Sequence, residues 1–163
     1  MFDQTDRAYA SEQGTKPQTI GYSLTDSPVG LLAWIYEKLV SWTDDYAWTD
    51  DEVLTWIAIY LFSRAGPAAA CRTYYEYMKH TKPRTEGKWY TSIPSGISYF
   101  PKEIQSTPRI FQRVNANLMF EAEHDKGGYF AATEQPGFLE GDLRKLFGKG
   151  GPAFGVVKGK TGY

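Results

Sequence analysis

Residues 123–147 read EHDKGGYFAATEQPGFLEGDLRKLF, and together with the segments before them they decide the fold class. The apolar run NLMFEA at 117–122 has the composition of a strand, and the Gly127-Gly128 pair after it indicates a turn into a helical segment that continues to Phe147. Upstream, TSIPSGISY at 91–99 predicts another strand, and residues 108–114 predict a short helix between the strands. This order of strand, crossover, strand and helix predicts an α/β fold.

The first half of the chain is predicted to be helical. Ser27 stands before a proline as a helix cap, and Thr49 and Glu52 have the spacing of a capping box, in which two side chains satisfy the free N–H groups of a new helix. The expected elements are a helix remnant within residues 1–16, helices over about 28–42, 50–63 and 67–80, and a surface loop over 81–89.

Composition bounds the class of protein. The 163 residues are 42% apolar, which suffices for one globular domain or a large piece of one. The 18 basic and 19 acidic residues nearly cancel, so a role in nucleic-acid binding is not expected. Cys71 stands alone, which excludes an internal disulfide, and it is interpreted as a small buried apolar residue rather than a reactive thiol. His80 and His124 lack zinc-site spacing, so no metal is expected.

The first twenty residues are polar and contain no apolar core of a signal peptide. No stretch approaches the roughly 18 apolar residues of a membrane span. The chain is therefore expected to be cytoplasmic and soluble, with no transmembrane segment. Its start has the appearance of a cut into a longer fold.

Three segments, in order, resemble the final third to half of epoxide hydrolases of the microsomal and fungal kind. They are PQTIGYSLTDSPVGLLAWIYEK at 17–38, ISYFPKEI at 97–104, and the stretch at 123–147 quoted above. The resemblance implies the C-terminal portion of an α/β-hydrolase fold, with its last strands and helices, plus the end of its helical cap. The implied domains are the end of the cap and the return into the core at 1–88, the strand-and-helix part of the core at 89–147, and a flexible glycine-rich tail at 148–163.

The resemblance also implies a reaction, the conversion of a small apolar epoxide to a vicinal diol without a cofactor. In the family an aspartate on a nucleophile elbow attacks an epoxide carbon, cap tyrosines protonate the departing oxygen, and a histidine–acid pair activates water to hydrolyse the ester. The acid follows a Phe-Pro-Lys run and so falls on Glu103. The histidine follows Gly-Gly, and its position falls on Tyr129. Tyr74, in the RTYYE run, falls where an epoxide-protonating phenol would stand.

Two parts of the family's machinery are not matched. No nucleophile elbow is present, because Thr25-Asp26-Ser27 lacks the flanking glycines and is better interpreted as a helix cap. Tyr129 replaces the base: a phenol with a pKa near 10 is ionised in about one molecule in a thousand at pH 7, a handicap of roughly 4 kcal/mol against histidine. A Tyr129 hydroxyl could instead donate a hydrogen bond to Glu103, forming a structural pair.

Each candidate residue has an ordinary alternative. Glu103 fits a solvated acid at a turn, but its place after a strand end predicts that it shares one rim of the sheet with Tyr129. Tyr74 is one of twelve tyrosines and also fits a helix-packing role. His124 could compensate for the missing base, although five positions of displacement favour a turn histidine bonded to local backbone.

Three hypotheses follow. The first is a truncated or degenerate epoxide-hydrolase homologue, with little activity alone. The second is a non-catalytic module that binds an apolar ligand or a partner through helices rich in tryptophan, or that self-associates through exposed apolar surface; its tryptophans are Trp34, Trp42, Trp48 and Trp56. The third is an incomplete gene model of an active enzyme, whose upstream segment supplies the nucleophile.

Overall fold

The computed structural model describes residues 7–80, 90–105, 107–157 and 159–160. The chain forms two compact units: Met1–Ser41 with Asp45–Pro83, and Trp42–Asp44 with Arg84–Tyr163. The break at 83/84 lies near the predicted boundary at 88/89, and the surface loop expected over 81–89 lies outside the described residues.

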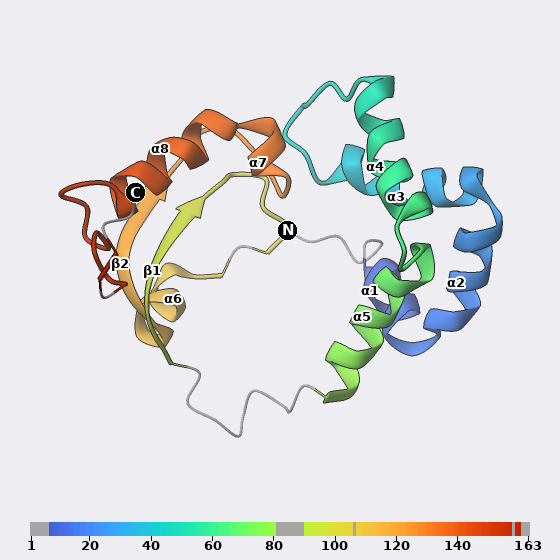
Figure 1. Ribbon diagram of the computed structural model, residues 1–163, viewed down its shortest axis with the longest axis horizontal. Coiled ribbons are helices and arrows are strands. Elements are labelled where there is room, and N and C mark those ends of the chain that lie inside the picture. Colours follow the sequence, from blue (N-terminus) through green and yellow to red (C-terminus); the bar gives the residue numbers. More distant parts are fainter. Residues whose placement is uncertain (1–6, 81–89, 106, 158, 161–163) are drawn as a thin grey trace. The chain divides into compact units, whose positions relative to one another are not determined.

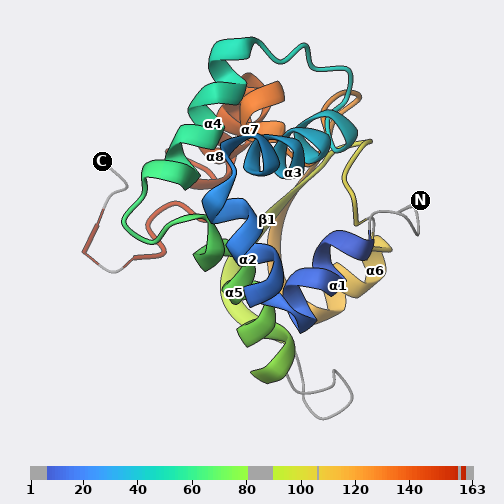
Figure 2. The same cartoon turned by 90° about the vertical axis from the view of Figure 1, so that its right-hand side faces the viewer.

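The first unit is a cluster of helices. Its elements are α1 (Arg7–Thr15), α2 (Pro17–Asp26), α3 (Pro28–Ser41), α4 (Asp50–Phe62) and α5 (Pro67–His80). Helices α1, α2 and α5 pack side by side (Figures 1 and 2). The buried apolar side chains on the helices of this unit are Leu24, Leu31, Ile35, Leu39, Val53, Ile57 and Cys71.

The predicted helix boundaries of this unit are confirmed to within a residue or two for α3, α4 and α5. Helix α2 was not predicted, because its segment PQTIGYSLTD carries few apolar residues. Pro17 begins α2 directly after α1 ends at Thr15, so the predicted turn joins two helices. Ser27 caps α3 as expected, since its Oγ accepts the Gly30 N–H at 3.0 Å.

The capping box at the start of α4 is also confirmed. The Thr49 N–H donates to Glu52 Oε2 at 2.9 Å, and the Glu52 N–H donates to Thr49 Oγ1 at 3.3 Å. The Tyr46 hydroxyl donates to the other carboxylate oxygen of Glu52 at 2.6 Å. The hydrogen bond from Tyr46, followed by those from Thr49, lowers the pKa of Glu52 below its ordinary value.

The second unit contains a parallel pair of strands with helices on both faces. Its elements are β1 (Thr91–Tyr99), α6 (Arg109–Asn115), β2 (Ala116–Glu123), α7 (Ala131–Glu134) and α8 (Pro136–Phe147). β1 and β2 run parallel, with Thr91 opposite Ala116 and Tyr99 opposite Glu123. Helix α8 lies along one face of the pair, and α6 lies at the other (Figure 1). The predicted strand, crossover, strand and helix order is therefore confirmed.

The C-terminal part of the second unit differs in two details from the prediction. The helical segment after the glycine turn is broken at Gln135, because Pro136 lacks an N–H and starts α8 afresh at its first position. Residues 148–155 after α8 form turns and bends, and one of these turns is anchored. Ala153 is buried, and its N–H donates to the Leu146 carbonyl at 2.9 Å.

No single helix among the described residues has the length and apolar character needed to cross a membrane. One bent pair, α4 with α5, meets that requirement jointly by length and composition, with a bend of 77° between its members.

We expect Glu52→Gln to lower the midpoint of thermal unfolding at pH 7, because the amide loses the charge-assisted hydrogen bonds from Tyr46 and Thr49. The folded-state pKa of Glu52 is depressed, so its stabilisation is present above the ordinary carboxyl value of about 4.3 and is lost as the pH falls through the lower folded pKa. The difference between the two proteins should therefore shrink below about pH 4. Circular dichroism melts over pH 3–7 measure it.

Asp51→Asn is the matched control, because it also removes a carboxylate from the first turn of α4. A loss equal to that of Glu52→Gln at pH 7 would attribute the effect to the helix dipole and contradict a role of the hydrogen bonds.

Candidate functional site

A tight turn follows β2 and carries Tyr129. Gly127 has a φ of +108°, and a Cβ placed on it would lie 2.8 Å from Phe100 Cδ1. A Cβ on Gly128 would lie 2.7 Å from the Trp42 carbonyl oxygen. Both positions therefore require glycine, one for its backbone conformation and both for the close approach of neighbouring chain.

The backbone of this turn is held by two carboxylates. Glu134 is 8% exposed, and its Oε1 accepts the N–H groups of Gly128 and Phe130, each at 3.1 Å. Its Oε2 accepts the Asp44 N–H at 2.6 Å, and Asp44 Oδ2 accepts the Gly127 N–H at 2.9 Å. The Tyr129 N–H donates to the Trp42 carbonyl at 2.9 Å. Every N–H from residue 127 to residue 130 is thus bonded, and none of these bonds uses the Tyr129 side chain.

Tyr129 projects its ring from this turn beside two aromatic side chains. The ring is edge-on to Trp42 at 5.1 Å and to Phe130 at 5.2 Å, and the residue is 45% exposed. It lines a hollow of about 400 Å³, together with Glu103, Ser98, Asp142 and apolar side chains that include Phe120 and Leu139. Glu103 and Tyr129 therefore face one hollow at the same end of the strands, as their positions in the sequence predict.

The predicted hydrogen bond between these two residues is wrong. The Glu103 carboxylate accepts the Gln105 N–H at 3.4 Å, and no hydrogen bond joins it to Tyr129 in the part of the chain that the structure describes. Glu103 is exposed, and the bend at residue 104 brings the backbone N–H of Gln105 close to the Glu103 carboxylate. A carboxylate in this setting is satisfied locally and by solvent.

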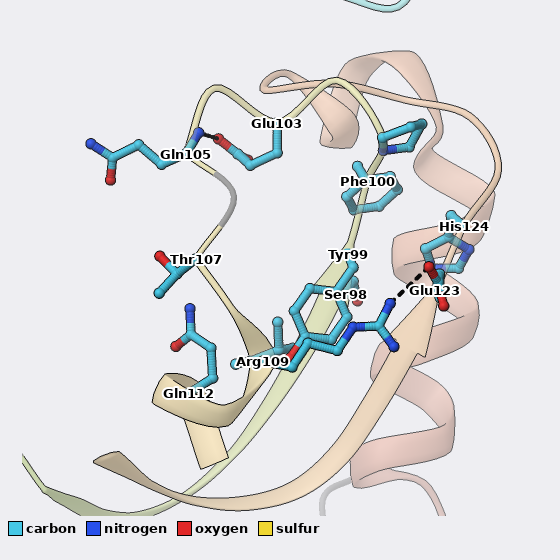
Figure 3. A pocket seen from close by; sticks show the side chains of 12 residues that line it. Ser98, Tyr99, Phe100, Glu103, Gln105, Thr107, Arg109, Gln112, Glu123 and His124 are labelled. Carbon is cyan, nitrogen blue, oxygen red and sulfur yellow. Dashed lines mark hydrogen bonds and ion pairs between the residues drawn. The ribbon is translucent and has the colours of Figure 1, made fainter. Parts of the chain in front are cut away.

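Glu103 also lines a second, larger hollow of about 590 Å³, which includes Tyr99, Arg109, Glu123 and His124. Figure 3 shows Glu103 on the loop at the top of the view and His124 at the end of β2. Arg109 binds Glu123 at 2.7 Å and lies 4.6 Å from the centre of the Tyr99 ring, and its hydrogen bond lowers the pKa of Glu123. Among the described residues that line this hollow, the one arginine is therefore matched by an acid.

His124 is not bonded to local backbone through its ring, contrary to the prediction. Its Nε2 lies 2.6 Å from Asp142 Oδ2 on α8, and the ring is stacked between Phe100 and Phe138 at centroid distances of 4.9 and 4.5 Å. The Ser98 hydroxyl donates to the same Asp142 oxygen at 2.7 Å. His124 does not line the hollow that Tyr129 faces, so the structure gives no support to His124 as a replacement base beside Tyr129.

Tyr74, the third predicted site residue, lies on α5 of the first unit. Its ring is edge-on to Tyr9 at 5.6 Å, and Tyr9 stacks on Trp34 at 5.0 Å with the Lys38 ammonium 5.2 Å from its centre. Burial raises the pKa of the Tyr9 phenol. Tyr74 thus belongs to an aromatic cluster of the first unit. In the same unit Cys71 is buried, as predicted, and burial raises the pKa of its thiol.

No protein-family model matches the chain. Epoxide hydrolase 1 of Oryctolagus cuniculus is 32% identical over 158 residues, a match that covers 86% of this chain and 33% of the relative. The solved structure of Aspergillus niger epoxide hydrolase is 36% identical with a TM-score of 0.73, covering 86% of this chain and 35% of that one. Juvenile hormone epoxide hydrolase of Bombyx mori is 28% identical with a TM-score of 0.74, covering 84% and 35%.

The chain is a homologue of microsomal and fungal epoxide hydrolases. It spans about a third of the length of the relatives that it matches. Its mixed α/β structure aligns with the corresponding part of their structures.

Sequence reasoning missed three acids of this homologue's site: Asp44 and Glu134, which hold the turn, and Asp142, which lines the hollow. Asp142 carried a signal, because Phe138, Asp142 and Leu146 recur every four residues and so place an acid on the apolar stripe of α8. An acid at such a position needs a buried partner. Glu134 and Asp44 carried no comparable signal, since their partners are backbone N–H groups, which every residue except proline supplies.

We expect Glu134→Gln to destabilise this epoxide-hydrolase homologue by about 2 kcal/mol or more, because an NH₂ group replaces one of the two buried acceptors. Amide hydrogen exchange at Gly128 and Phe130 should accelerate. Chemical denaturation and exchange measured by NMR check both effects.

Glu140→Gln is the matched control, because Glu140 is exposed and paired with Arg144 on the surface of α8. Its effect should stay within about 0.5 kcal/mol. Equal losses for the two variants would contradict a special role of Glu134.

Proposed function

We propose that this homologue carries the water-activating end of an epoxide-hydrolase site, on the C-terminal portion of an α/β-hydrolase fold, in a form that does not complete the reaction. The observation that carries this proposal is that Glu103 and Tyr129 line one hollow, with Tyr129 on a glycine turn whose backbone is fully bonded. This hollow has the acid position and the base position of the family's pair, with tyrosine at the base position.

The reaction has two steps with different requirements. In the first, an aspartate oxygen bonds to an epoxide carbon, the C–O bond of the ring breaks, and Tyr74 donates a proton to the departing oxygen. In the second, water attacks the ester carbonyl, which restores the aspartate and releases the diol. The first step needs an aspartate from outside these 163 residues, since none of them forms an elbow. The second needs a base, and a neutral phenol at position 129 is a poor one.

The two steps can be separated in a chimera, in which this chain replaces the segment that it matches in the Aspergillus niger enzyme. With Tyr129 in place we expect styrene oxide to form an ester that persists, seen as a mass increase of one epoxide molecule. Tyr129→His should clear the ester and raise diol formation at least about 100-fold, because a neutral imidazole accepts the proton from water at pH 7. Intact-protein mass spectrometry and diol release measure these outcomes.

Tyr129→Phe is the control for this chimera, and it should retain the ester as Tyr129 does. Glu103→Gln in the Tyr129→His background should slow clearance of the ester. Steady turnover with Tyr129 in place, or styrene oxide conversion by the 163-residue chain alone above the buffer rate, would contradict the proposal.

A second candidate function, binding of a small apolar ligand, is favoured by a hollow of about 320 Å³ in the first unit. Its lining residues are Leu32, Tyr36, Trp48, Asp50, Val53 and Leu54. Tyr36 and Leu54 are 44% and 57% exposed, so apolar surface is accessible there. Of the other tryptophans of this unit, Trp34 stacks on Tyr9 and Trp56 packs edge-on against Trp48.

If this candidate is right, anilinonaphthalene sulfonate should bind to the chain with enhanced fluorescence, and Leu54→Asp should weaken the binding about tenfold. Ile59→Asp is the matched control, because Ile59 is 63% exposed on the same helix and does not line the hollow. Fluorescence titration of the unchanged chain, Leu54→Asp and Ile59→Asp measures the affinity of each protein for the dye. Equal weakening by both substitutions would assign the dye to general apolar surface.

A further inference from the structure

A buried hydrogen-bonded pair, His124 and Asp142, lies beside the candidate site and takes no part in the reaction described above. His124 Nε2 lies 2.6 Å from Asp142 Oδ2, and the two side chains are 12% and 5% exposed. The Ser98 hydroxyl donates to the same oxygen at 2.7 Å. The three residues come from the end of β2, from α8 and from β1, so one carboxylate oxygen connects three elements. A carboxylate removed from water in this way is costly unless hydrogen bonds satisfy it, and here His124 and Ser98 both bond to it.

The His124 ring connects this pair to the loop that carries Glu103. One ring face stacks on Phe138 of α8 and the other on Phe100, at 10° and 21° to the ring plane. Phe100 follows β1 directly, and the Phe100 carbonyl accepts the Glu103 N–H at 3.4 Å. The position of Phe100 therefore sets where the Glu103 loop leaves the sheet.

Phe100 also touches the turn that carries Tyr129. A Cβ on Gly127 would come within 2.8 Å of Phe100 Cδ1, so the phenyl ring lies directly against this glycine. The Lys102 N–H donates to the Gly127 carbonyl at 3.1 Å, and the His124 N–H donates to the Tyr99 carbonyl at 3.0 Å. The loop after β1 and the turn after β2 are thus in contact, with Phe100 between the His124 ring and Gly127.

We propose that His124 and Asp142 are positioning residues, which hold Phe100 against the Gly127–Gly128 turn and so fix the separation of Glu103 and Tyr129. The kinetic part of this inference rests on the proposed function, and the structural part does not. His124 acts through Phe100 because both faces of its ring and its Nε2 atom are engaged by neighbours. The alternative, that His124 itself is a base, is an outcome of the test.

The structural part is tested by amide hydrogen exchange on the 163-residue chain. His124→Phe keeps an aromatic ring between Phe100 and Phe138 and removes the bond to Asp142, whereas Asp142→Asn keeps the shape and removes the charge. Exchange should accelerate about tenfold or more at residues 102–103 and 127–130, and by less along the β1–β2 ladder. Ser98→Ala removes only the hydroxyl bond to Asp142, so it should accelerate exchange at the same amides by a smaller factor.

His80→Gln is the matched control, because His80 forms an exposed pair with Glu76 on α5 and should leave all these amides unchanged. Equal acceleration over the ladder and the two loops would mean that the pair is merely structural and would overturn the proposal. Unchanged exchange in both His124→Phe and Asp142→Asn would overturn it as well. If Asp142→Asn fails to fold, His124→Phe and Ser98→Ala give the decision.

The kinetic part uses the chimera with Tyr129→His. Adding His124→Phe should slow ester hydrolysis about tenfold, with ester formation and KM unchanged, because only the geometry between Glu103 and the introduced imidazole is disturbed. Adding Asp142→Asn should do the same. Diol formation by the chimera that keeps Tyr129, lost on His124→Phe, would instead identify His124 as the base and overturn the positioning role. If the Tyr129→His chimera forms no diol, the proposed function fails while the exchange result stands by itself.

Discussion

Glu134 places a carboxylate beneath the turn at residues 127–130 and binds the N–H groups of Gly128, Phe130 and Asp44. A buried carboxylate is tolerated only where such bonds replace those it makes to water, and a tight turn is tolerated only where its N–H groups find acceptors. The Glu134 carboxylate and the N–H groups of the turn therefore satisfy each other's need for a hydrogen-bond partner. The direction of the Tyr129 side chain and the closeness of the Glu103 loop both follow from this arrangement.

This frame is built almost entirely from backbone and from residues other than 129. The N–H of residue 129 donates to the Trp42 carbonyl, and any amino acid except proline can make that bond. The side chain at this position can therefore change without disturbing the turn. A phenol is a poorer base than an imidazole at pH 7, so a change of side chain there alters the chemistry without altering the geometry. The proposed function therefore requires no change in this frame, only in the side chain that it carries.

The elements that sequence reasoning placed correctly are those with local signals. Three such signals each lie within one turn of helix and predict a helix start that the structure confirms. They are the capping box at Thr49 and Glu52, the cap at Ser27 and the proline at position 67. Helix α2 was missed because it carries few apolar residues, and only Gly21 and Leu24 are buried on it. The break at Gln135 was missed although Pro136 signals it, because the helical spacing continues across it.

By itself the sequence determined the order of strands and helices, the glycine turn, and the presence of Glu103 and Tyr129 after neighbouring strand ends. These depend on residues close to each other along the chain, or on the rule that parallel strands end at one edge of a sheet. Only the tertiary structure decided which side chains meet. Glu134 reaches Asp44 across 90 residues and His124 reaches Asp142 across 18, while Glu103 bonds to Gln105 rather than to Tyr129. Such pairings are set by packing between elements, because a hydrogen bond requires approach within about 3 Å and the sequence specifies no distances.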